Sequence, residues 1–128
     1  MERHKNKIIL VIDDEPDLRE MIQYQLQKSG FEVHTAINGA DALKKLKTIK
    51  PHLIILDMNM PEMGGKEFFK KICDKNDTPQ YPILVLTAAV SIESLFQDFN
   101  VNGYVAKPFT IEELMRAVKV ILDSESEA

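Results

Sequence analysis

The sequence lacks the features that mark secreted, membrane-spanning or nucleic-acid-binding chains. Cys73 is the only cysteine in 128 residues, so no disulfide can form within the chain, which fits a reducing cytoplasm. No apolar stretch is long enough to span a bilayer, and the polar start Met1–Lys5 lacks the apolar centre of a signal peptide. The scattered Lys and Arg residues number 16 against 20 acidic residues, a net charge of −4. We therefore expect a cytoplasmic domain that binds neither membrane nor nucleic acid directly.

The composition is that of one folded domain. Hydrophobic residues make up 45% of the chain and charged residues 28%, which supports a buried core with an ordinary wet surface. The length suits a single domain of common size. We expect this domain to cover residues 1–123, with residues 124–128 forming an acidic tail or the start of a linker.

Short, wholly apolar runs alternate with helical patterns along the chain. The runs are Ile8–Ile12, Leu53–Leu56 and Ile83–Leu86, which predict strands buried on both faces, as in a parallel sheet. Weaker strand candidates are Glu32–Thr35 and Gly103–Ala106. The alternation of strands and helices predicts an α/β fold whose functional crevice lies beyond the carboxyl ends of the strands.

The predicted helices have recognisable start and stop signals. They run from near Pro16 to Gly30, from the turn at Asn38-Gly39 to Pro51, around Phe68–Ile72, from Ser91 to about Phe99, and from Thr110 to Leu122. Proline is tolerated in a first turn, and glycine commonly ends a helix. The last helix is the clearest, because Thr110 and Glu113 have the spacing of a capping box.

Polar or charged residues stand directly after the predicted strands. Asp13 and Asp14 follow the first apolar run, Asp57 follows the second, Thr87 the third, and Lys107 follows Gly103–Ala106. Strands of a parallel sheet deliver such residues to one edge. Any one of the acids alone is more often a helix cap or turn residue, but such residues at successive strand ends are much less expected by chance.

Three converging carboxylates repel one another unless a positive charge balances them. Oxygen ligands that leave coordination positions to water are what Mg²⁺ prefers. Lys107 adds a second positive charge at the same edge. A carboxylate beside a hard cation, a lysine and a hydroxyl is equipped to attack a phosphoryl group, so the residues themselves point to phosphoryl chemistry.

Four stretches of the sequence resemble the response-regulator receiver domain, most closely its single-domain chemotaxis type. They are Val11–Glu15, Leu56–Pro61, Leu86–Ala88 and Tyr104–Phe109. The resemblance covers residues 7 to 122. It implies a flavodoxin-like (βα)5 three-layer sandwich with a parallel five-stranded sheet of order 2-1-3-4-5.

The resemblance also implies roles for the residues around the acids. Asp57 would be the phosphoacceptor. Asp14 and Asp57 would bind Mg²⁺ directly, Asp13 would act through water, and Asn59 would offer its backbone carbonyl.

Further roles concern the phosphorylated state. Thr87 would hydrogen-bond the new phosphoryl group and Lys107 would pair with it. The bond before Pro108 is expected to be cis, and Tyr104 would be the aromatic switch residue.

As a member of this family the protein would act in two-component phosphorelay signalling rather than as a conventional enzyme. A sensor histidine kinase or phosphotransfer protein would donate the phosphoryl group. An unknown output domain or protein would recognise the face formed by residues 91–99, 103–106 and 110–122. We expect a monomer or a weak dimer.

Two other classes of function use a similar sheet. Flavin binding needs a phosphate-cradling loop rich in Ser, Thr and Gly after the first strand, where Asp13–Glu15 would repel phosphate. A phosphatase with an aspartyl nucleophile would be expected to carry it at the first strand and to add a cap domain, for which the chain is short. A degenerate receiver that serves as a constitutive binding surface is disfavoured by the intact set Asp13, Asp14, Asp57, Thr87 and Lys107.

Overall fold

The computed structural model describes residues 4–58, 65–76, 78–88 and 100–127. Its strands are β1 (Ile8–Ile12), β2 (Glu32–Ala36), β3 (Leu53–Asp57), β4 (Ile83–Thr87) and β5 (Gly103–Ala106). Its helices are α1 (Pro16–Lys28), α2 (Gly39–Lys45), α3 (Gly65–Ile72) and α5 (Ile111–Glu127). The helix expected from Ser91 to about Phe99 lies outside the described residues.

The strands form one parallel sheet of five strands in the order β2-β1-β3-β4-β5. This confirms the predicted order. The two central strands β1 and β3 are neighbours, with Ile12 opposite Leu56 in the ladder. The residues that follow these two strands therefore lie side by side at the carboxyl edge of the sheet.

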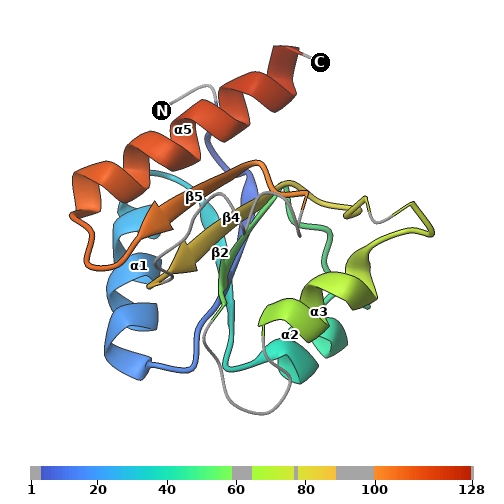
Figure 1. Cartoon of the computed structure of the whole chain (residues 1–128). Helices are drawn as coiled ribbons and strands as arrows, with labels where there is room; N and C mark the ends of the chain where they lie inside the picture. Colours follow the sequence, from blue (N-terminus) through green and yellow to red (C-terminus); the bar gives the residue numbers. More distant parts are fainter. Residues whose placement is uncertain (1–3, 59–64, 77, 89–99, 128) are drawn as a thin grey trace.

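The sheet is the middle layer of three, with α1 and α5 on one side and α2 and α3 on the other (Figure 1). Successive residues of β1 point to opposite sides. Ile9 and Val11 pack with the buried side chains of α1 and α5, whereas Leu10 and Ile12 pack with those of α2 and α3. Because both faces are covered, the inner strands β1, β3 and β4 are apolar over almost their whole length, which is why they could be recognised in the sequence.

Helix α1 begins and ends as its sequence predicts. Pro16 is its first residue, where the missing N–H has no helical partner to lose. Ser29 caps its carboxyl end and Gly30 follows with φ +99°, a left-handed conformation that glycine adopts at little cost. The turn carries the chain directly into β2.

Helix α2 ends earlier than the sequence suggested. Asn38 caps its start by accepting a hydrogen bond from the Asp41 amide, but the helix stops at Lys45 rather than continuing toward Pro51. The Lys45 carbonyl accepts from the Thr48 amide, the Ile49 amide and the Thr48 hydroxyl. A hydroxyl that competes for a helical carbonyl favours a turn over further helix.

Helix α5 has the predicted capping box. The Glu113 amide donates to Thr110 Oγ1 at 3.1 Å, and the Thr110 amide donates to Glu113 Oε1 at 3.2 Å. The helix continues to Glu127, so most of the expected tail is helical. The domain boundary at residue 123 stays a prediction.

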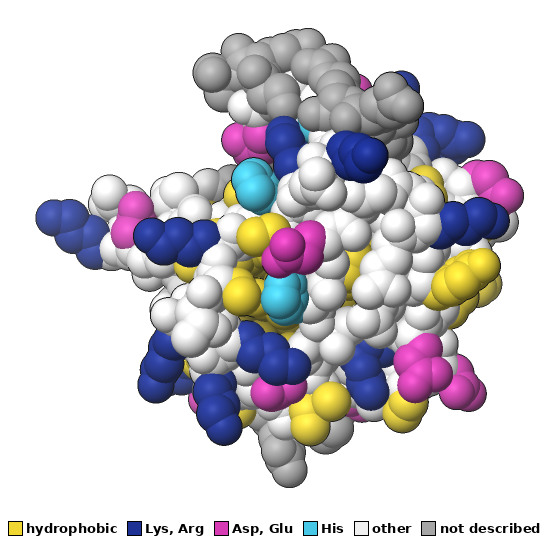
Figure 2. Space-filling model, turned by 180° about the vertical axis from the view of Figure 1, so that it is seen from behind, with side chains coloured by type: hydrophobic (Ala, Val, Ile, Leu, Met, Phe, Trp, Pro, Cys, Tyr) yellow, Lys and Arg dark blue, Asp and Glu magenta, His cyan; other side chains and the backbone are white. Residues whose placement is uncertain are grey.

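The surface is mixed in charge. In the view from behind, Lys and Arg side chains are spread over the whole face with Asp and Glu side chains between them (Figure 2). None of the helices in the described ranges combines the length and the apolar character needed to cross a bilayer.

Candidate functional site

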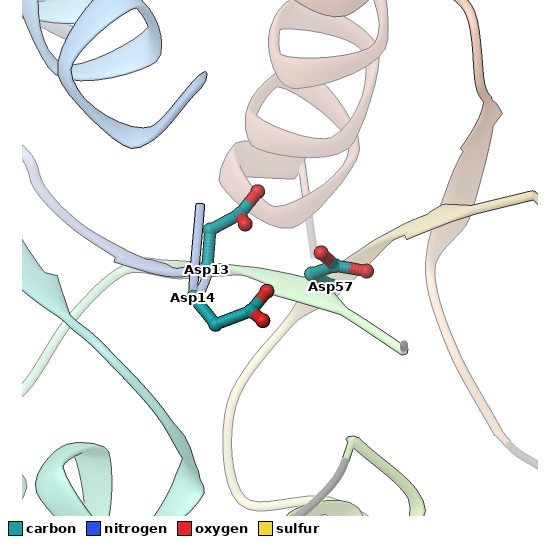
Figure 3. Close-up of side chains that lie close together, drawn as sticks. All are labelled: Asp13, Asp14 and Asp57. Atoms are coloured by element: carbon teal, nitrogen blue, oxygen red, sulfur yellow. The ribbon is translucent and has the colours of Figure 1, made fainter. Parts of the chain in front are cut away.

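Three acidic side chains meet at the carboxyl edge of the sheet. Asp13 and Asp14 follow β1, and Asp57 is the last residue of β3 (Figure 3). One carboxylate oxygen from each lies within 4.8 Å of the others. The three acids predicted to converge therefore do so, because β1 and β3 are adjacent and in register.

Asp13 is held in a fully buried position. Its side chain is 0% exposed, and its Oδ1 accepts a hydrogen bond of 2.9 Å from the Glu15 amide. Its Oδ2 is buried and has no hydrogen-bond partner among the described residues. Loss of hydration on burial, together with the nearby charge of Asp57, raises the pKa of Asp13 from 3.8 to about 6, against the opposing effects of the Glu15 hydrogen bond and Lys107.

Asp57 is paired with Lys107 across the site. The Asp57 side chain is 2% exposed, and the Lys107 ammonium donates to its Oδ2 at 2.9 Å. Lys107 follows β5, and its amide donates to the Thr87 carbonyl at 2.8 Å. The peptide bond between Lys107 and Pro108 is cis, as predicted.

Thr87 lies at the end of its strand, as expected, and Tyr104 lies within the neighbouring strand. Thr87 is the last residue of β4 and is buried, directly after Leu86, which stands opposite Asp57 in the ladder. Tyr104 lies within β5 and is 39% exposed. Asn59, whose backbone carbonyl was expected at the metal, lies outside the described residues. The roles of Thr87 and Tyr104 stay predictions.

The donor set fits a hard divalent cation. The three carboxylates carry three negative charges when ionised, and the ammonium of Lys107, which lies within hydrogen-bonding distance of Asp57, balances only part of that charge. The buried Oδ2 of Asp13 lacks a hydrogen-bond donor, which a metal-bound water would supply. Carboxylate oxygens with room for water are the ligands that suit Mg²⁺.

Two contacts in the described structure had no counterpart in the sequence interpretation. Arg19 Nη1 donates to the backbone carbonyl of Asp13 at 2.9 Å. The imidazole of buried His4 lies 2.6 Å from Asp123, across 119 positions of sequence. Neither pair is marked in the sequence by a hydrophobic periodicity or by a motif. The position of Arg19 one turn into a helix that follows the acids is the only hint that the sequence offers.

Comparisons with known proteins agree with the geometry. The family model for the response regulator receiver domain matches residues 9–119. The chain is 40% identical over 119 residues to the alkaline phosphatase synthesis transcriptional regulatory protein PhoP of Bacillus subtilis, covering 91% of this chain and 49% of that protein. It thus spans about half the length of relatives of this kind.

Solved structures with the same fold include receiver proteins of similar size. The chemotaxis response regulator CheY4 of Vibrio cholerae has a TM-score of 0.81 and 34% identity, covering 91% of this chain and 99% of that one. The response regulator TrrA of Thermotoga maritima, solved in complex with Mg²⁺ and BeF, has a TM-score of 0.76 and 40% identity, covering 90% of this chain and 98% of that one.

Proposed function

The chain belongs to the response regulator receiver family of two-component signalling, and we propose that it accepts a phosphoryl group on Asp57 with the help of Mg²⁺. The observation that carries this proposal is the placement of Asp57. It is a buried carboxylate that sits 2.9 Å from the ammonium of Lys107 and beside Asp13 and Asp14. An acid that only capped a turn at the end of a strand would need neither the lysine nor the two other acids beside it.

In the proposed transfer, an oxygen of the Asp57 carboxylate forms a bond to the phosphorus of the donor. The donor's own bond to that phosphorus breaks, and the leaving group keeps the electron pair. Lys107, already within hydrogen-bonding distance, would pair with an oxygen of the transferred group. The Thr87 hydroxyl would donate a hydrogen bond to another. Donors of this kind stabilise the charge on the equatorial oxygens.

The metal ligands would be the Asp14 and Asp57 carboxylates and the backbone carbonyl of Asn59, with Asp13 acting through water. A bound Mg²⁺ supplies positive charge to the phosphoryl oxygens. The proposal is supported by the close approach of the three acids and by the buried Asp13 Oδ2 without a hydrogen-bond partner. The complex of TrrA with Mg²⁺ and BeF adds support by similarity.

The response to phosphorylation would pass from Thr87 to Tyr104 and on to the surface of β5 and α5; residues 91–99, also expected to take part, lie outside the described residues. A groove of about 590 Å³ between β5 and α5 is lined by Tyr104, Arg116 and Val120 among others. Tyr104 is partly exposed beside this groove. A movement of its ring would change the surface that an output partner meets.

A sensor histidine kinase or a phosphotransfer protein would donate the phosphoryl group, and an output domain or protein would receive the signal. The relatives are regulators, and we propose that this chain is likewise a phosphoacceptor rather than a conventional enzyme. The net charge of −4 and the scattered basic side chains support a domain that does not bind nucleic acid itself (Figure 2). The cytoplasmic location and the monomeric or weakly dimeric state stay predictions.

The test is phosphorylation with a small donor. Wild-type protein is incubated with acetyl phosphate and Mg²⁺, and its intact mass is recorded. We expect one phosphoryl adduct, lost when EDTA replaces Mg²⁺ and lost in Asp57→Asn. Asp74→Asn is the matched control, because Asp74 is an exposed acid in the turn that carries Asn76 and Thr78.

Two results would contradict the proposal. One is the absence of an adduct in wild type together with the absence of any spectral response to beryllofluoride and Mg²⁺. The other is an adduct of equal yield in wild type and Asp57→Asn. Either would leave the degenerate receiver, or a different acceptor, as the better account.

A further inference from the structure

The junction between β1 and α1 is tied together by an arginine outside the acidic cluster. Arg19 lies one turn into α1 and is half-buried. Its Nη1 donates a hydrogen bond of 2.9 Å to the backbone carbonyl of Asp13. Hydrogen bonds from a charged guanidinium are stronger than those between neutral groups. The contact therefore links the first turn of the helix to the residue that opens the acidic site.

The other polar groups of Asp13 are also held. Its amide donates to the Ala36 carbonyl at 3.1 Å, which extends the ladder with β2. Its Oδ1 accepts from the Glu15 amide at 2.9 Å. Arg19 adds the carbonyl to this set, whereas Oδ2 has no hydrogen-bond partner in the part of the chain that the structure describes. The residue is thus held through its backbone and one carboxylate oxygen, while the other oxygen is buried.

The Asp13 carbonyl matters for Asp14 because the two belong to one planar unit. The peptide group joins the carbonyl of Asp13 rigidly to the amide of Asp14. Fixing the direction of the carbonyl therefore fixes the direction in which the Asp14 backbone leaves β1. The Asp14 side chain is exposed, so neighbouring side chains do not pack it into place. Its approach to Asp13 and Asp57 depends on that backbone.

From this geometry we infer that Arg19 is a positioning residue for the metal site: its bond to the Asp13 carbonyl orients the Asp13–Asp14 peptide, and thereby the Asp14 carboxylate, for binding a divalent cation. The inference rests on the proposed function. Groups that orient metal ligands typically alter metal affinity by about 10- to 100-fold when they are removed. Arginine suits the task because it stays charged and presents its donors on a rigid planar fork.

The test compares Mg²⁺ affinity among variants of the full chain by isothermal titration calorimetry. Arg19→Met keeps the apolar stem and Arg19→Gln keeps a neutral donor, and we expect both to weaken Mg²⁺ binding by about tenfold. Arg19→Lys, which retains a charged donor, is expected to recover most of that loss. The matched control is Lys28→Met, because Lys28 is an exposed cation in the last turn of the same helix. Its Mg²⁺ affinity should equal that of wild type.

Unfolding in EDTA separates positioning from general stability. A variant that only loosens the fold would lower the melting temperature and leave the Mg²⁺ dissociation constant unchanged, and that result would overturn the inference. If the Met variant does not fold by far-ultraviolet circular dichroism, the Gln variant decides: an affinity equal to wild type contradicts positioning, and a weaker one supports it. Failure of wild type itself to bind Mg²⁺ would overturn the proposed function together with this inference. If wild type binds Mg²⁺ and the Arg19 variants bind it with the same affinity, the inference alone is overturned.

Discussion

Replacing Asp13 with asparagine should stabilise the protein in the absence of metal. The Asp13 carboxylate is fully buried, and no described residue hydrogen-bonds to its Oδ2. Burial and the charge of Asp57 raise its pKa from 3.8 to about 6. Asparagine keeps an oxygen that can accept from the Glu15 amide, as Oδ1 does now, and carries no charge. The substitution therefore removes a buried charge that, through its lost hydration and its repulsion from Asp57, destabilises the folded protein at neutral pH.

The sign and size of the effect follow from proton linkage. A carboxyl group with a raised pKa binds its proton more tightly in the folded state, so its contribution to stability is fully present below pH 3.8 and is lost as pH rises through about 6. A difference of about two pKa units corresponds to about 3 kcal/mol. At pH 8 in EDTA we expect Asp13→Asn to be more stable than wild type by about 1–3 kcal/mol.

The assay is urea unfolding at pH 8, 6 and 4 in EDTA, repeated at pH 8 with saturating Mg²⁺. The advantage of Asp13→Asn should shrink toward zero as pH falls to 4, because wild-type Asp13 is then protonated as well. Mg²⁺ should stabilise wild type by about 2–3 kcal/mol at roughly a hundredfold excess over its dissociation constant, and the variant by less. Asp74→Asn should show neither effect. An Asp13→Asn variant that is no more stable than wild type at pH 8, or whose advantage is the same at pH 4, would refute the reasoning.

Three further substitutions test the contacts around the site and at the chain ends. Lys107→Met removes the ammonium that lies 2.9 Å from buried Asp57. We expect it to lower the free energy of unfolding by about 2 kcal/mol in urea at pH 8 in EDTA. An unchanged urea midpoint would contradict this expectation. Asp123→Ala removes the carboxylate that lies 2.6 Å from the imidazole of buried His4. We expect it to lower the free energy of unfolding by about 1–2 kcal/mol in thermal unfolding. A loss of stability no larger than that of Asp74→Asn would contradict a stabilising contact. Thr110→Ala removes the hydroxyl that caps α5 and should cost about 1 kcal/mol in the same assay; an equal melting temperature would show that the cap contributes nothing.

The strands could be predicted because they follow from patterns along the sequence, and their order because the resemblance to the receiver family implies it. A strand covered on both faces must be apolar throughout, so β1, β3 and β4 were placed to within one residue of their observed ends. Once β1 and β3 are adjacent, Asp13 and Asp57 have to meet. The clustering therefore needed only strand ends and strand order.

The features that escaped prediction depend on single side chains. Helix α2 ends at Lys45, where the amide and hydroxyl of Thr48 compete for its carbonyl, a contact that hydrophobic spacing does not reveal. Arg19 acts on a backbone carbonyl, and a backbone group has no sequence signature. The pairing of His4 with Asp123 joins residues 119 positions apart, a distance at which nothing in one sequence marks two residues as partners.

The most direct test of the central claim is to find the carboxylate that carries the phosphoryl group. Wild-type protein is phosphorylated with acetyl phosphate and Mg²⁺ and then treated with borohydride, which reduces an aspartyl phosphate to homoserine with loss of phosphate. Peptide mapping by mass spectrometry identifies the converted position. The account predicts homoserine at position 57 alone and no conversion in EDTA. Homoserine at Asp13 or Asp14, or none at position 57, would contradict it.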